Sequence, residues 1–237
     1  MIPNTEKSIL CLMLARGGSK GVPGKNIKLL NGKPLIYYTI KAVQKAGIYD
    51  RFMLSTDDPQ IAEVARGYDV DVPFIRPTSL AGDTASAVDA IEHALKWLEA
   101  QGETYDYVQY IFPTAPLRTC EDLLGGLDTL VSSDADMVIS VCKTDHPAQW
   151  MNVLPPDNSL QDFVKKEYRQ KNNQTLPATY RINGSIYVGK WEIFYNKLDW
   201  LEQDTVAHIM PRKRSIDIDL PLDFKLAEVI MKEKCNE

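Results

Sequence analysis

Short runs of apolar residues alternate along the chain with longer segments in which apolar residues recur at helical spacing. The apolar runs cover residues 8–14, 51–56, 107–112 and 137–142, a length typical of buried strands. The amphipathic segments cover 34–47, 58–66, 87–100 and 120–131. This alternation, with short connections, predicts an α/β protein with a mostly parallel central sheet and helices on both faces. In such a sheet, ligands bind beyond the carboxyl ends of the strands.

The regular alternation stops between residues 144 and 180. This segment contains four prolines and many polar residues, and it shows no helical period. Because a structureless stretch of this length is unusual inside a compact domain, we expect an arm that protrudes or packs on a partner. A strand over 180–188 and a helix over 221–232 follow. The chain therefore reads as one domain, residues 1–237, with 144–180 as its arm.

Charge is distributed unevenly along the chain. Residues 7–49 contain eight basic and no acidic side chains, so this segment carries +8 in a chain of net charge −5, and the remainder sums to −13. A local basic segment in an acidic protein indicates an anion site and argues against nucleic-acid or anionic-membrane binding. No apolar run is long enough for a signal peptide or a membrane span. The four cysteines are widely spaced and form no metal or disulfide pattern, so we expect a cytoplasmic protein.

The basic segment contains a glycine-rich loop, L-A-R-G-G-S-K-G-V-P-G-K-N, over residues 14–26. Glycines allow backbone N–H groups to approach phosphate oxygens, and lysines neutralise the phosphate charge. The loop is not a P-loop, because Ser19 stands where its first glycine belongs and Asn26 stands where its hydroxyl belongs. It is not the dinucleotide fingerprint either, because the glycines do not fall at G-x-G-x-x-G offsets.

Two carboxylates near the other end of the chain are suited to a metal ion. In an extended segment Asp217 and Asp219 face the same way, about 6.6 Å apart along the chain, with isoleucines on the opposite face. Beside a polyphosphate, such a pair suits Mg²⁺, which takes one or two carboxylates together with phosphate oxygens and water. The alternative is that Asp219 caps the helix that follows it.

The predicted strand at 180–188 contains a further candidate binding residue, Arg181. Alternation places Arg181, Asn183 and Ser185 on one face of that strand. The planar fork of an arginine pairs with a carboxylate or a phosphate, and the alternative for Arg181 is a structural salt bridge.

Four ordered motifs, spread from about Ile9 to Ala227, carry a resemblance to a known family. They are the loop at 14–26, P-T-A-P-L-R at 113–118, R-I-N-G-S-I-Y at 181–187 and S-I-D-I-D at 215–219. Together they resemble the acylneuraminate cytidylyltransferases, which make CMP-activated nonulosonic acids. The resemblance implies a Rossmann-like nucleotidyltransferase fold and a reaction of CTP with a nonulosonic acid that gives the CMP-sugar and pyrophosphate.

The resemblance also implies roles for individual residues. The catalytic residues are Arg16, Lys25, Asp217 and Asp219, with Mg²⁺ as the cofactor, bound by Asp217 and Asp219. The expected nucleotide-binding residues are Leu14, Ala15, Arg16, Lys20, Lys25, Asn26, Arg76 and Ser86. The expected acceptor-sugar residues are Phe112, Thr114, Arg181 and Asn183. The arm would be a dimerisation arm that reaches the active site of a second copy.

Two departures from the family pattern bear on the sugar. Phe112 stands where glutamine usually touches the acceptor, and Trp150 stands where sialic-acid enzymes often carry lysine. N-acetylneuraminate, legionaminate and pseudaminate all remain open as acceptors. The alternatives to this function are a CMP-Kdo-type synthetase and a noncatalytic nucleotide-sugar binding protein of the same fold.

Overall fold

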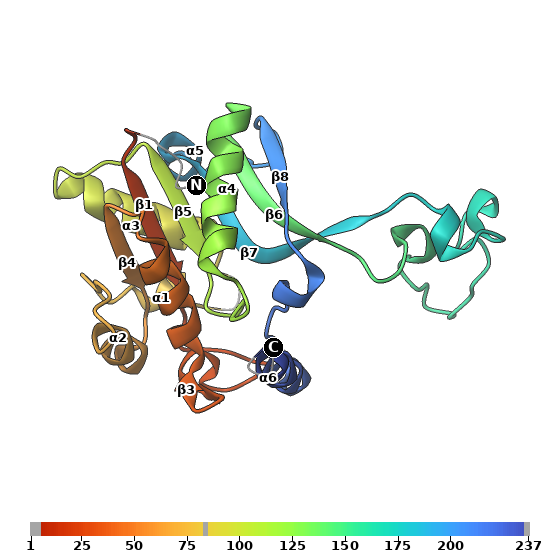
Figure 1. Ribbon diagram of the computed structural model, residues 1–237, viewed down its shortest axis with the longest axis horizontal. Helices are drawn as coiled ribbons and strands as arrows, with labels where there is room; N and C mark the ends of the chain where they lie inside the picture. Colours follow the sequence, from red (N-terminus) through yellow and green to blue (C-terminus); the bar gives the residue numbers. More distant parts are fainter. Residues whose placement is uncertain (1–5, 83–84, 235–237) are drawn as a thin grey trace.

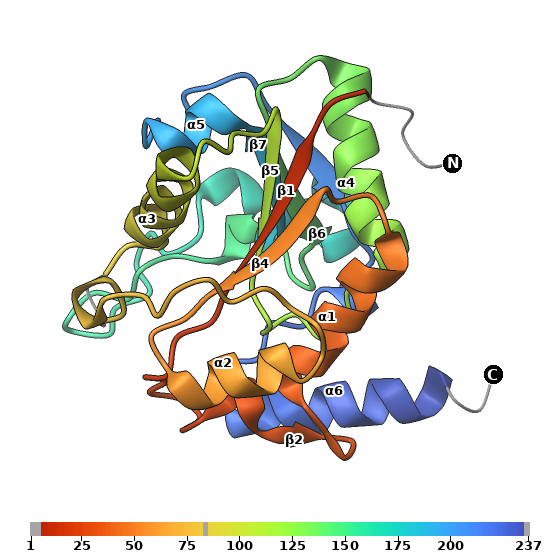
Figure 2. The same cartoon turned by 90° about the vertical axis from the view of Figure 1, so that its left-hand side faces the viewer.

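The computed structural model describes residues 6–82 and 85–234, and it contains a six-stranded sheet with helices on both faces (Figures 1 and 2). The strands are β1 (Ile9–Leu14), β4 (Arg51–Ser55), β5 (Tyr107–Ile111), β6 (Met137–Lys143), β7 (Tyr180–Lys190) and β8 (Thr205–Ile209), in the order β4-β1-β5-β7-β6-β8. Strand β7 runs antiparallel to both of its neighbours, and the other pairings are parallel. The predicted α/β class with a mostly parallel sheet is confirmed.

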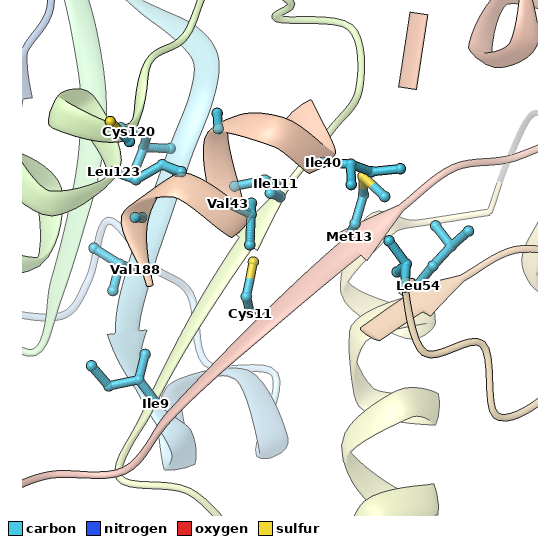
Figure 3. Packing of buried hydrophobic residues seen from close by; sticks show 14 of the residues in the cluster. Ile9, Cys11, Met13, Ile40, Val43, Leu54, Ile111, Cys120, Leu123 and Val188 are labelled. Atoms are coloured by element: carbon cyan, nitrogen blue, oxygen red, sulfur yellow. The ribbon is translucent and has the colours of Figure 1, made fainter. Parts of the chain in front are cut away.

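Helices α1 (Leu35–Ala46), α2 (Pro59–Arg66) and α4 (Cys120–Ser133) cover one face of the sheet, and α3 (Ala87–Ala100) and α5 (Trp191–Tyr195) cover the other. Alternate residues of β1 separate the two cores: Cys11 and Met13 face α1, whereas Leu10 and Leu12 face α3. Figure 3 shows Ile40 and Val43 of α1 close to Met13 and Cys11. Burial of these side chains is the main favourable contribution to folding.

The helix boundaries follow local sequence signals. Gly47 ends α1 in the left-handed conformation, with φ of 62°. The Asp58 side chain caps α2 by accepting a hydrogen bond from the Gln60 amide at 2.8 Å. The Ser86 hydroxyl caps α3 in the same way, with the Val88 amide at 3.1 Å. The polar residues Asp83 and Thr84, shortly before α3, lie outside the described residues.

A third, smaller core joins the two ends of the chain. It contains Val22, Leu30 and Leu35 from the N-terminal part and Ile218, Phe224 and Ala227 from the C-terminal part. Leu30 belongs to the two-residue strand β2 (Leu29–Leu30), which forms a hairpin with β3 (Lys33–Pro34). Phe224 and Ala227 belong to α6 (Pro221–Lys234), which lies beside this hairpin (Figure 2). This core holds the glycine-rich loop against the segment that contains the two aspartates.

The segment at 144–180 extends from the ends of β6 and β7 away from the rest of the molecule (Figure 1). It contains only the short 3₁₀ turns η3 (Ala148–Trp150), η4 (Lys166–Tyr168) and η5 (Asn173–Thr175). Exposed apolar side chains gather on it: Met151, Val153, Leu154 and Leu160. The predicted protruding arm is therefore present.

Two expectations about extended segments are corrected. Residues 215–219 belong to no strand: Ser215 has a ψ of 27°, outside the extended range, and the Ile218 amide donates to the Thr114 carbonyl at 2.8 Å instead of to a sheet neighbour. Along β7 the simple alternation fails: Arg181 is exposed, whereas Asn183 and Ser185 are buried. The cause is a bulge. Ile139 pairs with Tyr187 and Val141 pairs with Ile182, so two steps along β6 face five steps along β7.

Among the described residues, no helix combines the length and the apolar character that crossing a membrane requires. Cys11, Cys120 and Cys142 are buried free thiols, and Cys235 lies outside the described residues.

Candidate active site

A pocket of about 360 Å³ opens at the carboxyl ends of β1, β4 and β5. Parallel strands bring their ends to one edge, so the loops that follow them share this space. Eight of the predicted site residues line the pocket: Leu14, Arg16, Lys25, Asn26, Arg76, Ser86, Phe112 and Thr114. Of the other nucleotide-site predictions, Ala15 is buried behind the pocket, and Lys20 lines a smaller hollow beside it.

The glycine-rich loop is held in place by its backbone. Asp57 accepts a hydrogen bond from the Gly17 amide at 3.0 Å, and the Asn26 side chain donates to the Arg16 carbonyl at 2.9 Å. The loop passes so close to the aspartate segment that a Cβ on Gly21 would lie 2.1 Å from the Asp219 carbonyl oxygen. Glycine is therefore required at position 21 by close approach of the two backbones.

Lys25 and Asp219 meet at this contact, although 194 positions separate them in the sequence. The Lys25 ammonium lies 2.9 Å from the Asp219 carboxylate and 2.5 Å from the Ile218 carbonyl. Lys25 is 11% exposed and lines the pocket, whereas Asp219 is 74% exposed. The cationic loop therefore contacts the segment that contains the two aspartates, although neither Asp217 nor Asp219 is among the residues that line the pocket.

Asp219 does not cap α6 in the structure. Asp223 does so instead, by accepting hydrogen bonds from the Asp219 amide at 2.9 Å and the Leu220 amide at 2.7 Å. This arrangement leaves the Asp219 carboxylate to Lys25 and to solvent.

Asp217 is more enclosed than Asp219. Burial raises the pKa of the Asp217 carboxyl, the neighbouring Asp219 raises it further, and interactions with Thr114, Lys25 and Arg181 oppose the rise. Its buried Oδ1 atom has no hydrogen-bond partner. A buried carboxylate oxygen without a partner is costly unless a cation or a ligand satisfies it.

The donor set fits a hard divalent cation that also binds phosphate. The two aspartates contribute carboxylate oxygens only, as Mg²⁺ prefers, and Asp217 Oδ1 is available. No group of three or more His, Cys, Asp or Glu residues gathers within residues 6–82 and 85–234.

The far wall of the pocket is polar and rigid. Arg76 is buried, donates to the Ser55 carbonyl and hydroxyl at 3.5 Å and lies 3.7 Å from Asp57. Burial lowers the pKa of its guanidinium, and the positive charge of Arg16 lowers it further. Ser86 lines the pocket while it caps α3.

The structure does not bring Arg181 and Asn183 into the pocket lining. The Asn183 side chain is 1% exposed, accepts from the Ser140 hydroxyl at 2.5 Å and donates to the Ser215 hydroxyl at 2.9 Å. These bonds fix the β7 bulge, so Asn183 has a structural role, and its contact with a sugar stays a prediction. Arg181 is exposed and donates to the Ser215 carbonyl at 3.1 Å. Its contact with an acceptor stays a prediction.

Two residues of the site were missed in the sequence. Asp57, to which the sequence analysis gives no role, anchors the glycine-rich loop through the Gly17 amide. Its position directly after β4 was the available signal. Arg118 ends the P-T-A-P-L-R motif and was given no role, yet it is almost fully buried and donates to the carbonyl of the pocket-lining Phe112.

Comparison with known proteins agrees with this geometry. The sequence model of a family described as cytidylyltransferase matches residues 10–230. The pseudaminic acid cytidylyltransferase of Campylobacter jejuni (serotype O:23/36) is 33% identical over 229 residues, which cover 94% of this chain and 96% of the relative. The CMP-N,N'-diacetyllegionaminic acid synthase of Legionella pneumophila is also 33% identical, with the same coverage.

A third relative is longer. The N-acylneuraminate cytidylyltransferase of Escherichia coli O18:K1:H7 is 30% identical over 227 residues, which cover 95% of this chain and 52% of that protein. Among solved structures, a CMP:2-keto-3-deoxy-manno-octonic acid synthetase complexed with CTP superposes with a TM-score of 0.72 at 14% identity, covering 96% of this chain and 99% of that one. At this identity the likeness shows a shared fold. From the family match and the two relatives at 33% identity, the chain belongs to the cytidylyltransferase family.

Proposed function

We propose that this protein transfers the cytidylyl group of CTP to a nonulosonic acid and releases pyrophosphate. The observation that carries the proposal is the 2.9 Å contact between Lys25 and Asp219 at the edge of the pocket. It joins a cationic loop, suited to a triphosphate, to a carboxylate pair, suited to the metal that accompanies one. A noncatalytic nucleotide-sugar binding protein would need the loop but would have no need of the aspartates.

The chain supplies positioning and charge for the proposed reaction. The anomeric hydroxyl of the sugar attacks the α-phosphorus in line, the bond to the β-phosphate oxygen breaks, and pyrophosphate leaves. Arg16 and Lys25 hold the triphosphate and stabilise the leaving pyrophosphate, and Lys20 adds to the positive field. Asn26, Arg76 and Ser86 orient the nucleoside.

Asp217 and Asp219 would hold Mg²⁺ at this site. Bound there, the ion would polarise the α-phosphate and lower the pKa of the attacking hydroxyl. The partnerless Oδ1 of Asp217 and the oxygen donors of the two carboxylates support this choice of metal.

The sugar belongs to the acidic, nine-carbon class named in the relatives. Those at 33% identity are named for pseudaminic acid and for diacetyllegionaminic acid, and the one at 30% for N-acylneuraminate. Phe112 supplies an aromatic wall to the pocket where the resembled family usually has glutamine, and Trp150 stands where sialic-acid enzymes often carry lysine. We therefore expect pseudaminate or legionaminate to be used in preference to N-acetylneuraminate.

We further propose that two copies associate through the arm in the cytoplasm. The apolar side chains at Met151, Val153, Leu154 and Leu160 are exposed in the single chain, and burial against a second copy would remove them from water. Buried free thiols fit a reducing compartment.

The test is pyrophosphate release on adding CTP, Mg²⁺ and each of N-acetylneuraminate, legionaminate, pseudaminate and Kdo. The proposal expects release with at least one of the nine-carbon acids and formation of the corresponding CMP-sugar. CTP binding without turnover on any sugar would instead identify a noncatalytic binding protein. Turnover on Kdo alone would assign the eight-carbon substrate.

A further inference from the structure

Arg118 is a buried cation that is linked to the pocket through the carbonyl of Phe112, a residue of the pocket lining. It is 3% exposed and belongs to the loop between β5 and α4. No carboxylate of the described residues lies within ion-pair distance of its guanidinium, and its Nε atom has no hydrogen-bond partner. Burying an arginine without an ion pair costs stability, so this position calls for a compensating role.

The guanidinium joins three elements through neutral acceptors. It donates to the Ser185 carbonyl in the β7 bulge at 2.5 Å, to the Thr39 hydroxyl in α1 at 2.9 Å and to the Phe112 carbonyl after β5 at 3.1 Å. Only the planar fork of an arginine can span three such acceptors, since a lysine ammonium is a compact point donor.

Two of these acceptors adjoin the groups that support Asp217. Phe112 and Thr114 both line the pocket, and the Thr114 carbonyl accepts from the Ile218 amide at 2.8 Å. Ser185 follows Gly184, where a Cβ would lie 3.1 Å from an Asp217 carboxylate oxygen. The Arg118 contacts therefore fix two of the segments that enclose Asp217, one on either side.

We propose that Arg118 is a positioning residue, which holds the end of β5 and the β7 bulge at the spacing that places Asp217 at the active site. The proposal rests on the function proposed above for the reaction itself. It assigns Arg118 no contact with substrate. Its effect on turnover passes through Thr114 and Asp217.

The test compares Arg118→Lys with the same substitution at a partly buried arginine remote from the site. Arg51 lies at the opposite end of β4 from the pocket and pairs with Asp71 and Glu103, so Arg51→Lys is the matched control. Both variants should lower the melting temperature. Only Arg118→Lys should lower kcat, by roughly 100-fold, the size of effect expected for misplacement by about 1 Å. The KM for CTP should change less than threefold, because the phosphate-binding loop is untouched.

A readout that does not need turnover is hydrogen exchange of the Ile218 amide and of peptides that cover 183–187. Arg118→Lys should increase exchange at both places at least tenfold, and Arg51→Lys should leave both unchanged. If Arg118→Lys does not fold, Thr39→Val is the substitute test. It removes one acceptor and retains Arg118, so hydrogen exchange should increase at the same two places but by a smaller factor.

The outcomes separate the two proposals. Unchanged exchange at both places in Arg118→Lys or in Thr39→Val, or equal losses of kcat in the Arg118 and Arg51 variants, would overturn the positioning role. An inactive wild-type protein with the expected exchange pattern would overturn the proposed reaction and leave the positioning role supported.

Discussion

At the scale of single residues, the site depends on one lysine that faces both the pocket and the aspartate segment. Lys25 faces the pocket and also contacts Asp219 and the Ile218 carbonyl. In this position its ammonium can move a short distance toward a triphosphate without losing every partner. Its strongest electrostatic effect is expected in the transition state, where negative charge collects on the leaving pyrophosphate.

Lys25→Ala should therefore lower kcat/KM, because it removes about 2–4 kcal/mol of transition-state stabilisation. This loss is comparable to that of one oxyanion-hole donor. Pyrophosphate release under subsaturating CTP measures the effect. Lys41→Ala, on the exposed side of α1 in the same basic segment, is the control and should change kcat/KM less than twofold. Equal losses of kcat/KM in the two variants would mean that turnover depends on the overall basic charge of the segment and not on the position of Lys25.

Asp219→Asn should abolish most of the magnesium-dependent turnover while the melting temperature stays near that of the wild type. The side chain is exposed and does not cap α6, so its loss leaves the fold intact. Asp128→Asn, on the exposed face of α4, controls for the change in net charge. Near-normal turnover of Asp219→Asn at every Mg²⁺ concentration would remove the metal assignment.

At the scale of elements, two close approaches of backbone determine where the loop and the bulge lie relative to the aspartates. Gly21 lies against the Asp219 carbonyl, and Gly184 lies against the Asp217 side chain. Each glycine connects one sequence motif to another, so the motifs constrain one another in space.

Gly21→Ala should displace the loop from the aspartate segment and lower kcat/KM more than tenfold. Gly18→Ala in the same loop meets nothing within 4 Å, and neither glycine has a positive φ, so the second variant controls for the alanine itself. Steady-state kinetics and melting temperatures of both variants measure the difference. Similar kinetics would show that the loop moves freely against Asp219.

Gly184→Ala carries the strain of a left-handed residue, with φ of +69°, in addition to its contact with Asp217. The conformation alone costs about 1–2 kcal/mol. Gly102→Ala has a φ of +80° with open space around it, so it reports the strain by itself. Denaturant unfolding should show both losses, and only Gly184→Ala should also lose turnover. Full activity of Gly184→Ala would show that the Asp217 carboxylate tolerates displacement.

The elements also show what the sequence could and could not reveal. The bounds of α3 follow directly from its apolar period and match the predicted 87–100. The burial of Asn183 could not be predicted, because alternation presumes a regular ladder and the β7 bulge depends on Ser140, which lies 43 positions away. Residues 215–219 look like a strand, but their amide partner is Thr114 in a distant loop. Helix α5, only five residues long, has too few positions to show a period.

At the scale of the whole molecule, the arm is the feature that a single chain does not explain. Val153 is 86% exposed, and further apolar side chains lie near it on a segment with little regular structure. Its loop character and its protrusion could be predicted from prolines and the lost period. The surface on which the arm would pack in a second copy could not be predicted, because the hydrophobic pattern of one chain does not describe contacts between two chains.

Val153→Glu should convert the proposed dimer to a monomer with little change in melting temperature of the isolated chain, because the side chain is already in water. Sedimentation or light scattering at micromolar concentration measures the mass. Leu201→Glu, exposed on the body of the protein, is the control and should leave the mass unchanged. A monomeric wild type under these conditions would contradict association through the arm.

The small core that joins Val22 and Leu30 to Ile218 and Phe224 has a consequence for biosynthesis. Lys25 precedes Asp219 by 194 positions, so the ribosome makes the loop long before the aspartates. Until Phe224 has left the exit tunnel, its side chain cannot pack against the loop. Nascent chains can therefore form much of the sheet yet remain catalytically silent, and activity should appear only after the aspartate segment has been made.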